Sequence, residues 1–242
     1  MIDVHEKLKE VLRDSDNIVF FGGAGVSTES GIPDFRSEDG LYNMKYKYPP
    51  ETILSHTFFM RNTSEFYQFY RDKMLHPNAQ PNKAHLALAE LERRGKLKAI
   101  VTQNVDGLHH KAGSVNVLEL HGSRSRYYCM KCRNLFTMDC VFEAEDIPMC
   151  PCGGMIRPDV VLFEEALDQS VIERSVAAIY DADVLIVGGT SLNVYPAAGL
   201  IQHYRGKMLI LINKSETSYD RTANLIIREP IGETLDAAMP PI

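Results

Sequence analysis

Short apolar runs recur along the chain and are separated by segments with a different periodicity. The runs read NIVFF, LKAIVT, VNVLEL, DVLIVGG, KMLILI and NLII, and most of them lack a strict alternation of apolar and polar residues. Strands that are buried on both faces of a parallel sheet have this pattern. We therefore expect these six runs to be strands of one parallel sheet.

Helical spacing of apolar residues fills several of the segments between the runs. Val4, Leu8, Val11 and Leu12 recur at the spacing of an amphipathic helix before the first run. Further helical patterns read KAHLALAELERR, QSVIERSVAAIYD and PAAGLIQHY. Alternating strands and helices indicate an α/β fold whose parallel strands are joined by short crossovers.

Two stretches interrupt this alternation. The first, from Glu38 to Pro81, is rich in Tyr, Phe, Pro and Asn and has a helical patch over residues 64–75. The second, from Ser123 to Arg157, holds all five cysteines. We expect both to be insertions that form a smaller second domain. The predicted larger domain comprises residues 1–38, 82–122 and 158–242, and the smaller one comprises residues 39–81 and 123–157.

Four of the cysteines stand in two close pairs, Cys129-x2-Cys132 and Cys150-x-Cys152. Two such thiolate pairs are the ligand set of a tetrahedral Zn²⁺, and four protein ligands leave no open position for catalysis. The sequence therefore predicts one structural zinc per chain. Scattered buried cysteines and a redox pair are the alternatives, because C-x-C is less common than C-x2-C. Cys140 is expected to be a small core or surface residue.

Polar residues follow five of the predicted strands. Ligands of open parallel sheets bind beyond the carboxyl ends of the strands. We therefore expect these residues to share one crevice. They are the loop from Gly23 to Thr28 after NIVFF, Gln103, Asn104 and Asp106 after LKAIVT, His121 after VNVLEL, Thr190 and Ser191 after DVLIVGG, and Asn213 after KMLILI.

The glycine loop alone is the weaker signal. Gly23-x-Gly25 fits a tight turn beside a pyrophosphate, and Ser27 or Thr28 is placed to cap a short helix. However, Thr28 stands where G-x-G-x-x-G requires its third glycine, and no acidic residue ends a second strand about twenty residues on. A dehydrogenase is therefore disfavoured, and a glycine-rich structural turn is the alternative.

His121 is the candidate general base, because the unperturbed pKa of histidine lies near neutrality. A lone histidine at a strand end is more often structural, but the neighbouring Asn104 and Asp106 favour catalysis. Asp106 also fits a solvated Asp-Gly turn. Arg36 could be a surface charge, and Phe35 could be a core ring.

Composition narrows the setting of the protein. The chain has 242 residues, a hydrophobic content of 45% and a net charge of −6. This charge argues against non-specific binding to nucleic acid. No apolar run is long enough to span a bilayer, and the charged first residues do not resemble a secretory signal. We expect a cytoplasmic protein with no specific nucleic-acid partner and no membrane association, in a compartment that keeps its thiols reduced.

Several longer motifs occur together. The stretches GAGVSTESGIPDFRS, TQNVDGLHHKAG, HG after a strand, two cysteine pairs, RPDVVLFEE and GGTSLNVYPA follow one another in this order. Together they resemble the sirtuins, which are NAD-dependent protein-lysine deacylases, over about residues 19–213. The resemblance implies a Rossmann-like parallel sheet with helices on both faces, plus a small domain made of a zinc-binding module and a helical insert. It implies NAD as co-substrate and acetylated lysine-containing proteins or peptides as partners.

The resemblance also assigns roles to individual residues. His121 would be the general base on a ribose hydroxyl, with Asn104 and Asp106 as further catalytic residues. NAD would contact Gly23, Ala24, Gly25, Thr28, Phe35, Arg36, Gln103, Asn104, Val105, Asp106, Thr190, Ser191, Asn213 and Ile231. The substrate peptide would lie as an added strand, held largely by main-chain bonds, between Val160, Leu162 and Phe163 on one side and Asn193 and Val194 on the other. Zinc would be bound by Cys129, Cys132, Cys150 and Cys152.

The implied reaction explains why a phosphate loop continues into Phe35 and Arg36. The acyl-lysine oxygen attacks the ribose C1′ and nicotinamide leaves, so the reactive sugar must be shielded from water. His121 then activates a ribose hydroxyl that attacks the resulting imidate. Water completes the transfer, which yields free lysine and acyl-ADP-ribose.

Two departures from the family pattern bear on substrate choice. Glu164 stands where the family has a glycine in FGE, which could alter the backbone beside the peptide. Sirtuins that prefer succinyl or malonyl lysine carry Tyr-x-x-Arg, whereas the closest stretch here is Tyr70-Arg71-Asp72-Lys73. Lysine lacks the bidentate fork that arginine offers to a carboxylate. We therefore expect deacetylation, or removal of another uncharged acyl group, to be favoured over desuccinylation.

Three rival functions are distinguishable. An NAD-linked oxidoreductase would change NADH absorbance during turnover. An ADP-ribosyltransferase on the same fold would label protein with ADP-ribose, and the presence of His121 disfavours it. A binding module that uses the zinc lobe would leave the polar residues at the strand ends without a purpose.

Overall fold

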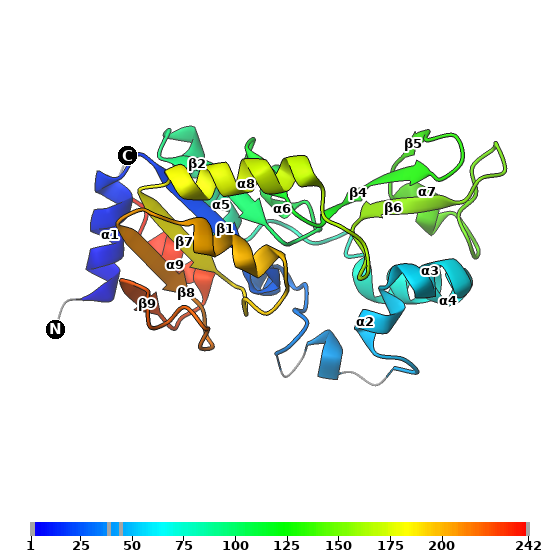
Figure 1. Ribbon diagram of the computed structural model, residues 1–242, viewed down its shortest axis with the longest axis horizontal. Coiled ribbons are helices and arrows are strands. Elements are labelled where there is room, and N and C mark those ends of the chain that lie inside the picture. The colour runs from blue at the N-terminus through cyan, green and yellow to red at the C-terminus, as the bar shows by residue number, and fades with distance from the viewer. Residues whose placement is uncertain (1–2, 38–39, 44–45, 241–242) are drawn as a thin grey trace.

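One parallel sheet forms the centre of the molecule. The computed structural model describes residues 3–37, 40–43 and 46–240. Within them, six strands pair in parallel in the order β3-β2-β1-β7-β8-β9 (Figure 1). All six predicted strands are present, and the predicted α/β class is confirmed. They are β1 (Ile18–Gly22), β2 (Leu97–Thr102), β3 (Val117–Glu119), β7 (Val184–Gly188), β8 (Met208–Ile212) and β9 (Leu225–Ile227).

Helices cover both faces of this sheet because successive side chains of its strands point in opposite directions. Phe20 packs with Leu8 in one hydrophobic core, whereas its neighbour Phe21 packs with Ile179 in the other. Residues of α1 (Val4–Asp14), α5 (Lys83–Arg93) and α9 (Ile231–Ala237) fill the first core, and residues of α8 (Gln169–Asp181) and η5 (Ala197–His203) fill the second. We call the sheet with these helices the large lobe.

The segment PAAGLIQHY is helical, as its periodicity predicts, but it is wound differently from the other crossover helices. Residues Ala197–His203 form the 3-10 helix η5. Gly199 lies in its centre, where the missing side chain lowers the preference for the α-helix. Ala198 and Ile201 are nevertheless buried against the sheet, so the segment still covers this face.

A smaller lobe projects beyond the carboxyl ends of the strands (Figure 1). Its three-stranded antiparallel sheet has the order β5-β4-β6, with β4 (Gly122–Cys129), β5 (Leu135–Phe136) and β6 (Ile156–Val160). The helix α7 (Asp139–Phe142) belongs to the same region. The helical insert supplies α2 (Pro50–Ile53), α3 (His56–Arg61), α4 (Thr63–Phe69) and the π-helix η4 (Tyr70–Met74).

A third hydrophobic core joins the two insertions into one small lobe. Phe59, Phe66 and Tyr67 of the helical insert pack with Tyr127 and Ile156 of the cysteine-containing segment. Phe59 and Phe66 make an edge contact with ring centroids 4.8 Å apart. The hydroxyl group of Tyr67 donates a hydrogen bond to the carbonyl oxygen of Ile156. Residues from both insertions therefore share one interior.

The predicted domain limits remain predictions. The limit between residues 38 and 39 falls outside the described residues. The strand β4 begins one residue before the predicted limit at Ser123, and β6 continues past the limit at Arg157. These two strands therefore connect the lobes directly. Within the part of the chain that the structure describes, no helix has the length and apolar character needed to cross a bilayer.

Candidate active site

Two glycine loops cross at the carboxyl end of the central strands. The amide of Gly25, in the 3-10 turn η1 (Ala24–Val26), donates to the carbonyl oxygen of Gly189 at 2.8 Å. A Cβ atom on Gly25 would lie 2.8 Å from the Cα atom of Gly189. Gly189 itself has a φ of 59°, which favours glycine. Both positions therefore require glycine for the loops to pass each other.

Ser27 does not cap a helix, so that expectation is wrong. No side-chain capping bond is present at Ser27, and the hydroxyl of Thr28 donates back to the carbonyl oxygen of Gly25. Instead, the buried Ser27 hydroxyl donates to Oδ2 of Asp106 at 2.7 Å and accepts from Nδ2 of Asn104 at 3.1 Å. The Ser27 hydroxyl bonds to Asp106 and Asn104 and not to a backbone amide of its own turn, because the loop after β2 brings these two side chains to it.

The Asp106 carboxylate has two fixed donors. Its Oδ2 atom takes the Ser27 hydroxyl proton, and its Oδ1 atom accepts from the amide of Leu108 at 2.9 Å, at the start of α6 (Leu108–Lys111). Asn104 is buried, and its backbone N–H donates to the hydroxyl of Thr102 at 3.0 Å. Asp106, Asn104 and Ser27 thus form one oriented polar cluster.

His121 is held in a single tautomer. Its Nδ1 atom lies 2.9 Å from the carbonyl oxygen of Gln103. Because a carbonyl oxygen only accepts, Nδ1 carries the proton and the neutral ring keeps a lone pair on Nε2. Burial lowers the pKa of His121, and the hydrogen bond to Gln103 opposes this shift. The ring is therefore neutral at physiological pH, as a general base must be.

The ends of β2, β7 and β8 are linked by hydrogen bonds among Gln103, Thr190 and Asn213. The Gln103 side chain donates to the Thr190 hydroxyl at 3.0 Å. The Asn213 amide group accepts from the backbone N–H of Thr190 at 3.0 Å and donates to its carbonyl oxygen at 2.9 Å. These bonds fix the loop after β7 against the ends of β2 and β8.

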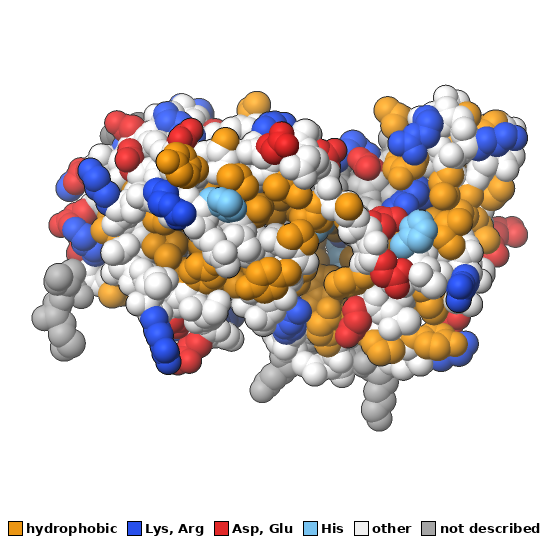
Figure 2. All heavy atoms as spheres, in the orientation of Figure 1, with side chains coloured by type: hydrophobic (Ala, Val, Ile, Leu, Met, Phe, Trp, Pro, Cys, Tyr) orange, Lys and Arg blue, Asp and Glu red, His pale blue; other side chains and the backbone are white. Residues whose placement is uncertain are grey.

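Two adjoining pockets contain almost all of the residues predicted to contact NAD or the peptide. A cavity of about 310 Å³ lies between the lobes, and a pocket of about 630 Å³ lies beside it on the large lobe. Figure 2 shows the surface hollowed where the lobes meet. The cavity between the lobes is lined by Gly23, Ala24, Phe35, Arg36, Gln103, Asn104, Val105, Asp106, His121, Val160, Leu162, Phe163, Thr190, Ser191 and Val194. The adjoining pocket is lined by Gly25, Thr28, Thr190, Ser191, Asn213 and Ile231, and Asn193 lines neither.

Phe35 and Arg36 line the cavity between the lobes. The Phe35 ring contacts the ring of Tyr42, with centroids 5.6 Å apart, and the Arg36 guanidinium lies 5.4 Å from the same Tyr42 ring. Arg36 also donates to the hydroxyl of Ser191 at 3.2 Å across the opening. This side of the site therefore combines an aromatic cover with a positive charge.

The segment after β6 forms the opposite wall, and its main chain is largely bonded within the protein. The amide of Val161 donates to the carbonyl oxygen of His121 at 2.9 Å. Phe163 donates to the carbonyl oxygen of Leu54 and accepts from the amide of His56, both at 3.0 Å. The amide of Leu162 donates to the Glu165 carboxylate at 2.9 Å. A peptide on this side therefore meets few unused main-chain groups around Leu162 and Phe163.

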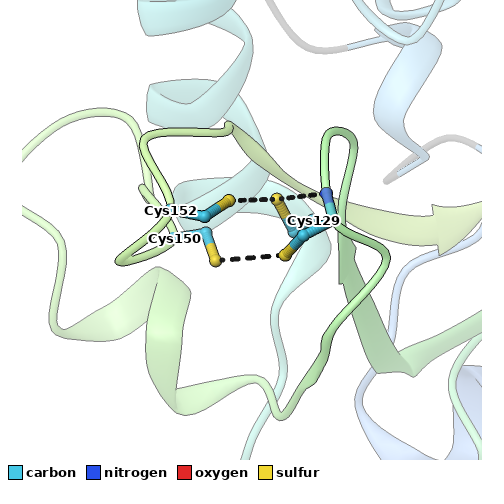
Figure 3. A group of neighbouring side chains, drawn as sticks. Cys129, Cys150 and Cys152 are labelled. Atoms are coloured by element: carbon cyan, nitrogen blue, oxygen red, sulfur yellow. Dashed lines mark hydrogen bonds between the residues drawn. The ribbon is translucent and has the colours of Figure 1, made fainter.

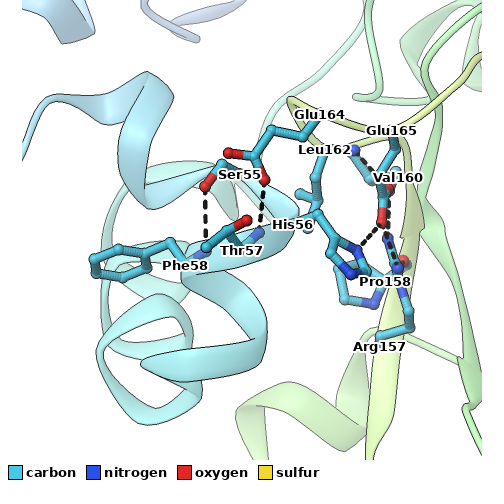
Figure 4. A network of polar contacts seen from close by, with 10 residues as sticks. All are labelled: Ser55, His56, Thr57, Phe58, Arg157, Pro158, Val160, Leu162, Glu164 and Glu165. Atoms are coloured by element: carbon cyan, nitrogen blue, oxygen red, sulfur yellow. Dashed lines mark hydrogen bonds and ion pairs between the residues drawn. The ribbon is translucent and has the colours of Figure 1, made fainter.

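Glu165 joins this wall to both parts of the small lobe (Figure 4). Its carboxylate accepts from Arg157 at 2.8 and 2.9 Å and lies 2.8 Å from Nδ1 of His56. Burial opposes ionisation of this group, but the bonds from Arg157, Leu162 and His56 prevail and lower its pKa to about 2. Glu165 is therefore an anion that fixes the wall.

Glu164 adopts the backbone conformation that glycine prefers. Its φ is 75°, in the left-handed region. One oxygen of its exposed carboxylate accepts from the amide of Thr57 at 2.8 Å, in the first turn of α3 (Figure 4). This contact with the helix terminus compensates for the unfavourable backbone conformation. Glu164 therefore combines a glycine-like backbone conformation with an acidic side chain at the rim of the cavity.

Sequence reasoning missed Arg124, which lines the cavity between the lobes, and it named Tyr70 only for its likeness to the Tyr-x-x-Arg pattern. Arg124 and Tyr70 are both buried there, at 7% and 1% exposure. Arg124 lies in the irregular part of β4, where the register shifts between Ser123 and Tyr127. Its place two residues after His121-Gly122 was the available signal, since a strand that leaves His121 begins at the same cavity.

The four paired cysteines meet at one point (Figure 3). Their sulfur atoms all lie within 4.8 Å of one another, with 3.5 Å between Cys129 and Cys152 and 3.6 Å between Cys132 and Cys150. Four thiolates around a zinc ion at about 2.3 Å would be separated by about 3.8 Å. The arrangement therefore fits a structural zinc. Cys140 is outside this group and packs against the core of the small lobe.

Comparisons with known proteins agree with this geometry. A family-level sequence model described as the Sir2 family matches residues 23–196. An "NAD-dependent protein deacetylase" of Clostridium acetobutylicum is 58% identical over 243 residues, which cover 99% of this chain and 99% of that protein. A similar protein of Clostridium perfringens, with the same description, is 57% identical over 97% of this chain and 98% of its own length.

Solved structures extend the likeness to the whole fold. A structure described as "Sir2-p53 peptide-NAD+" is 37% identical, has a TM-score of 0.87 and covers 98% of both chains. Another, a substituted Sir2 with deacetylated p53 peptide and 3′-O-acetyl ADP ribose, is also 37% identical. It has a TM-score of 0.88 and covers 97% of this chain and 96% of that one. The arrangement of both lobes is therefore shared with these proteins.

Proposed function

The chain belongs to the Sir2 family of NAD-dependent protein deacetylases, and on that premise we propose that it transfers acetyl groups from lysine side chains to ADP-ribose. The products are free lysine, nicotinamide and O-acetyl-ADP-ribose. A related Sir2 structure with a deacetylated peptide and 3′-O-acetyl ADP ribose supports this set of products. The relevant substrates are acetylated proteins or peptides.

The observation that carries the proposal is the state of His121. The Gln103 carbonyl oxygen holds the proton on Nδ1, so Nε2 has its lone pair inside the cavity between the lobes. A ribose hydroxyl next to Nε2 can lose its proton to this nitrogen and attack the carbon of the former acetyl group. Asn104 and Asp106 orient the sugar and the nicotinamide end of NAD. The Ser27 hydroxyl in turn orients the side chains of Asn104 and Asp106.

NAD occupies both pockets in this proposal. Its nicotinamide end lies in the cavity between the lobes, beneath Phe35, and its adenosine end lies in the adjoining pocket by Asn213 and Ile231. Thr190 and Ser191 line both pockets and would contact the connecting part of the molecule. Zinc holds the small lobe in shape and takes no part in the chemistry.

The acetylated peptide lies between the wall after β6 and the segment after β7. Val160, Leu162, Phe163 and Val194 all line the cavity between the lobes. Because the amides of Leu162 and Phe163 are bonded within the protein, more of the main-chain pairing would come from Asn193 and from the amide of Val194, whose carbonyl oxygen already accepts from Ala198. The need to keep zinc-binding thiolates reduced favours the cytoplasm as the compartment.

Acetyl is the favoured acyl group over succinyl. The Lys73 ammonium is bound to the Asp72 carboxylate at 2.9 Å, so its charge is already balanced. It also lacks the fork that binds a terminal carboxylate at two points. Arg124 is the other cation of this part of the cavity, and it is attracted to Asp106. If succinyl were the better substrate, Arg124 would be the first residue to replace.

Mass spectrometry of modified peptides tests this function. One acetyl-lysine peptide and its succinyl counterpart are incubated with the protein, with and without NAD, beside the variant His121→Ala. We expect loss of acetyl only with NAD, formation of O-acetyl-ADP-ribose and nicotinamide, and slower loss of succinyl. The variant should be slower by about 10²–10⁴-fold, the usual contribution of a general base.

Each alternative outcome has a distinct meaning. Consumption of NAD with an unchanged peptide would contradict the deacetylase proposal. ADP-ribose attached to protein would favour a transferase instead. Succinyl removed as fast as acetyl would contradict only the acyl preference.

A further inference from the structure

The wall after β6 leaves the main chain of Glu164 unused. Phe163 is bonded to the helical insert through both its N–H and its carbonyl oxygen, and the amide of Glu165 donates to the carbonyl oxygen of Leu162 at 3.1 Å. Neither the N–H nor the carbonyl oxygen of Glu164 has a hydrogen-bond partner among the residues that the structure describes. Glu164 is exposed and lines the cavity between the lobes. A peptide that lies along this wall as an added strand can therefore pair with the main chain of Glu164.

Such pairing brings the Glu164 side chain close to the side chains of the peptide. Residues directly opposite each other in paired strands have Cβ atoms about 4.5–5.5 Å apart, and diagonal neighbours lie about 7–8 Å apart, within reach of long side chains. In the proposed reaction the acetyl-lysine side chain enters the cavity toward His121. The side chains that meet Glu164 at the rim are therefore those of the residues that flank the acetyl-lysine.

The Glu164 carboxylate is an anion with a fixed position. One of its oxygen atoms accepts from the backbone N–H of Thr57 at 2.8 Å (Figure 4). The side chain of Thr57 and this N–H both stabilise the charged form, so they lower the pKa of Glu164 from its usual 4.5. An ionised carboxylate has about four lone-pair sites for hydrogen bonds. Glu164 is therefore charged at neutral pH and can accept further hydrogen bonds from a ligand.

The positively charged groups that act on Glu164 do not form an ion pair with it. His56 and Arg61 of α3 attract its carboxylate and lower its pKa further, but no ion pair joins either of them to Glu164 within the described part of the chain. His56 is bound instead to Glu165, which also accepts two hydrogen bonds from Arg157. Of the two carboxylates that line the cavity on this wall, Glu164 is therefore the one that remains accessible to a cation of the substrate.

We propose that Glu164 gives the enzyme a preference for substrates with a lysine or arginine within two positions of the acetyl-lysine. The ammonium or guanidinium group of that basic residue pairs with the Glu164 carboxylate at the rim, and main-chain pairing sets the register. This proposal rests on the proposed deacetylase function and names a class of substrate for the same site. The contact is remote from the reacting atoms, so it affects peptide binding and leaves the chemical step unchanged. The glycine of the family pattern lacks the side chain for this contact.

Matched acetyl-lysine peptides test this proposal. One parent sequence carries Lys, Gln or Glu in turn at each of the two positions before and the two positions after the acetyl-lysine. We measure kcat and KM for each peptide with saturating NAD. At one or more positions kcat/KM should be about twofold to fivefold higher with Lys than with Gln, the range of an exposed ion pair, and lower with Glu than with Gln. The difference should lie in KM, and raising the salt concentration from about 0.05 M to about 0.5 M should reduce it, because salt screens exposed charges.

Variants show whether Glu164 is responsible. Glu164→Gln removes the charge but keeps an oxygen atom for the Thr57 amide, and it should bring the ratio of Lys to Gln kcat/KM toward one. Glu164→Lys should reverse the preference in favour of the Glu peptide. Glu173→Gln is the matched control, because it changes the net charge by the same amount and Glu173 is exposed on α8 outside both pockets. This control should keep the wild-type ratio. Because each ratio is taken within one variant, a general loss of activity cancels.

The outcomes separate this proposal from the deacetylase function. Equal kcat/KM for the Lys, Gln and Glu peptides at all four positions would overturn the proposal while leaving deacetylation intact. A preference for Lys that persists in Glu164→Gln would overturn it too, because another acidic group would then bind the basic residue. An equal loss of preference in Glu173→Gln would assign the effect to net charge and not to Glu164. No removal of acetyl from any of the peptides would refute the deacetylase function itself.

Discussion

A single backbone carbonyl oxygen determines which nitrogen of His121 carries the proton. The carbonyl oxygen of Gln103 selects the tautomer, and burial keeps the ring neutral. The sequence predicts a histidine at a strand end, since VNVLEL precedes it. It does not predict the tautomer, because Gln103 and His121 lie at the ends of different strands and meet only when β2 and β3 pair.

The pH dependence of the reaction follows from this state. Protonated His121 has no lone pair on Nε2, so the rate should fall as pH decreases through the pKa of His121 in the folded protein. Because burial lowers this pKa from its usual 6.5, the midpoint of the acid limb should lie below pH 6.5. The single-turnover rate measured between pH 4.5 and 8 checks this. A midpoint at or above 6.5 would contradict it, and His121→Ala should lack the limb.

Glu164 makes a separate prediction about backbone strain. Glu164→Ala loses the bond to the Thr57 amide but keeps the φ of 75°, whereas Glu164→Gly loses the bond and relieves the φ. We expect the glycine variant to unfold at a temperature about 2–4 °C above that of the alanine variant. Thermal unfolding followed by circular dichroism measures the difference. The reverse order would mean that the backbone at 164 is not strained.

Other single residues were beyond the reach of sequence patterns. Ser27 reads as a helix cap, because the competing acceptor on Asp106 is 79 positions away. Arg124 was not singled out by any sequence pattern, because the shift of register beside it is a tertiary feature. Pattern rules weigh neighbours in the chain, and both residues are governed by distant ones.

Among the elements, the paired strands β4 and β6 run from His121 to the four-cysteine cluster. The pairing begins at Gly122 with Val160, beside His121, and ends at Cys129 with Ile156. A Cβ atom on Gly122 would lie 2.2 Å from the carbonyl oxygen of Asp159, so this start of the ladder requires glycine. The four-cysteine cluster and His121, the proposed general base, therefore lie at opposite ends of one ladder.

Removing a zinc ligand should therefore affect both ends. Cys132→Ser should lower the zinc content from one per chain to well below one, and it should reduce deacetylation by disordering β4. Cys140→Ser is the matched control and should keep both, because Cys140 lies outside the four-sulfur group. Elemental analysis with a deacetylation assay measures the two quantities. Full activity without zinc would show that the ladder does not depend on the metal.

Element types were predictable where burial alone decides them. The strands of the large sheet are apolar on both faces, and β1, β7 and most of β2 and β8 are fully buried. The helical patch over residues 64–75 was predicted, but the change from α4 to the π-helix η4 at Tyr70 was not. That change depends on packing of the small lobe, for example the stacking of Phe66 on Tyr70.

In the whole molecule, the two pockets are built from different parts of the protein, and in the proposed function only NAD enters the pocket on the large lobe. The adjoining pocket lies on the large lobe alone, whereas the cavity between the lobes needs residues of both. The sequence predicted this convergence from the general position of ligands in parallel sheets. It could not predict the distance between the lobes, which depends on contacts such as those of Glu165 with Arg157 and His56.

A substitution in the pocket on the large lobe should therefore weaken the binding of NAD more than that of the peptide. Asn213→Ala removes both bonds to Thr190 in the adjoining pocket. We expect KM for NAD to rise about tenfold, because roughly 1.4 kcal/mol of positioning energy is lost. KM for the peptide, measured with saturating NAD, should change by less than about twofold. Steady-state kinetics with each substrate varied in turn checks this, and equal increases in both values would contradict the division.

The irregular part of β4 has a consequence for how such enzymes diversify. Between Ser123 and Tyr127 the strand leaves its register with β6 and then regains it before the cysteines. Residues in this interval, such as Arg124, have no partner in the β4–β6 ladder, so we expect their substitution to leave the pairing at both ends in place. On the proposed function, natural variation and directed evolution could alter the cavity wall here while His121 and the four-cysteine cluster are inherited unchanged.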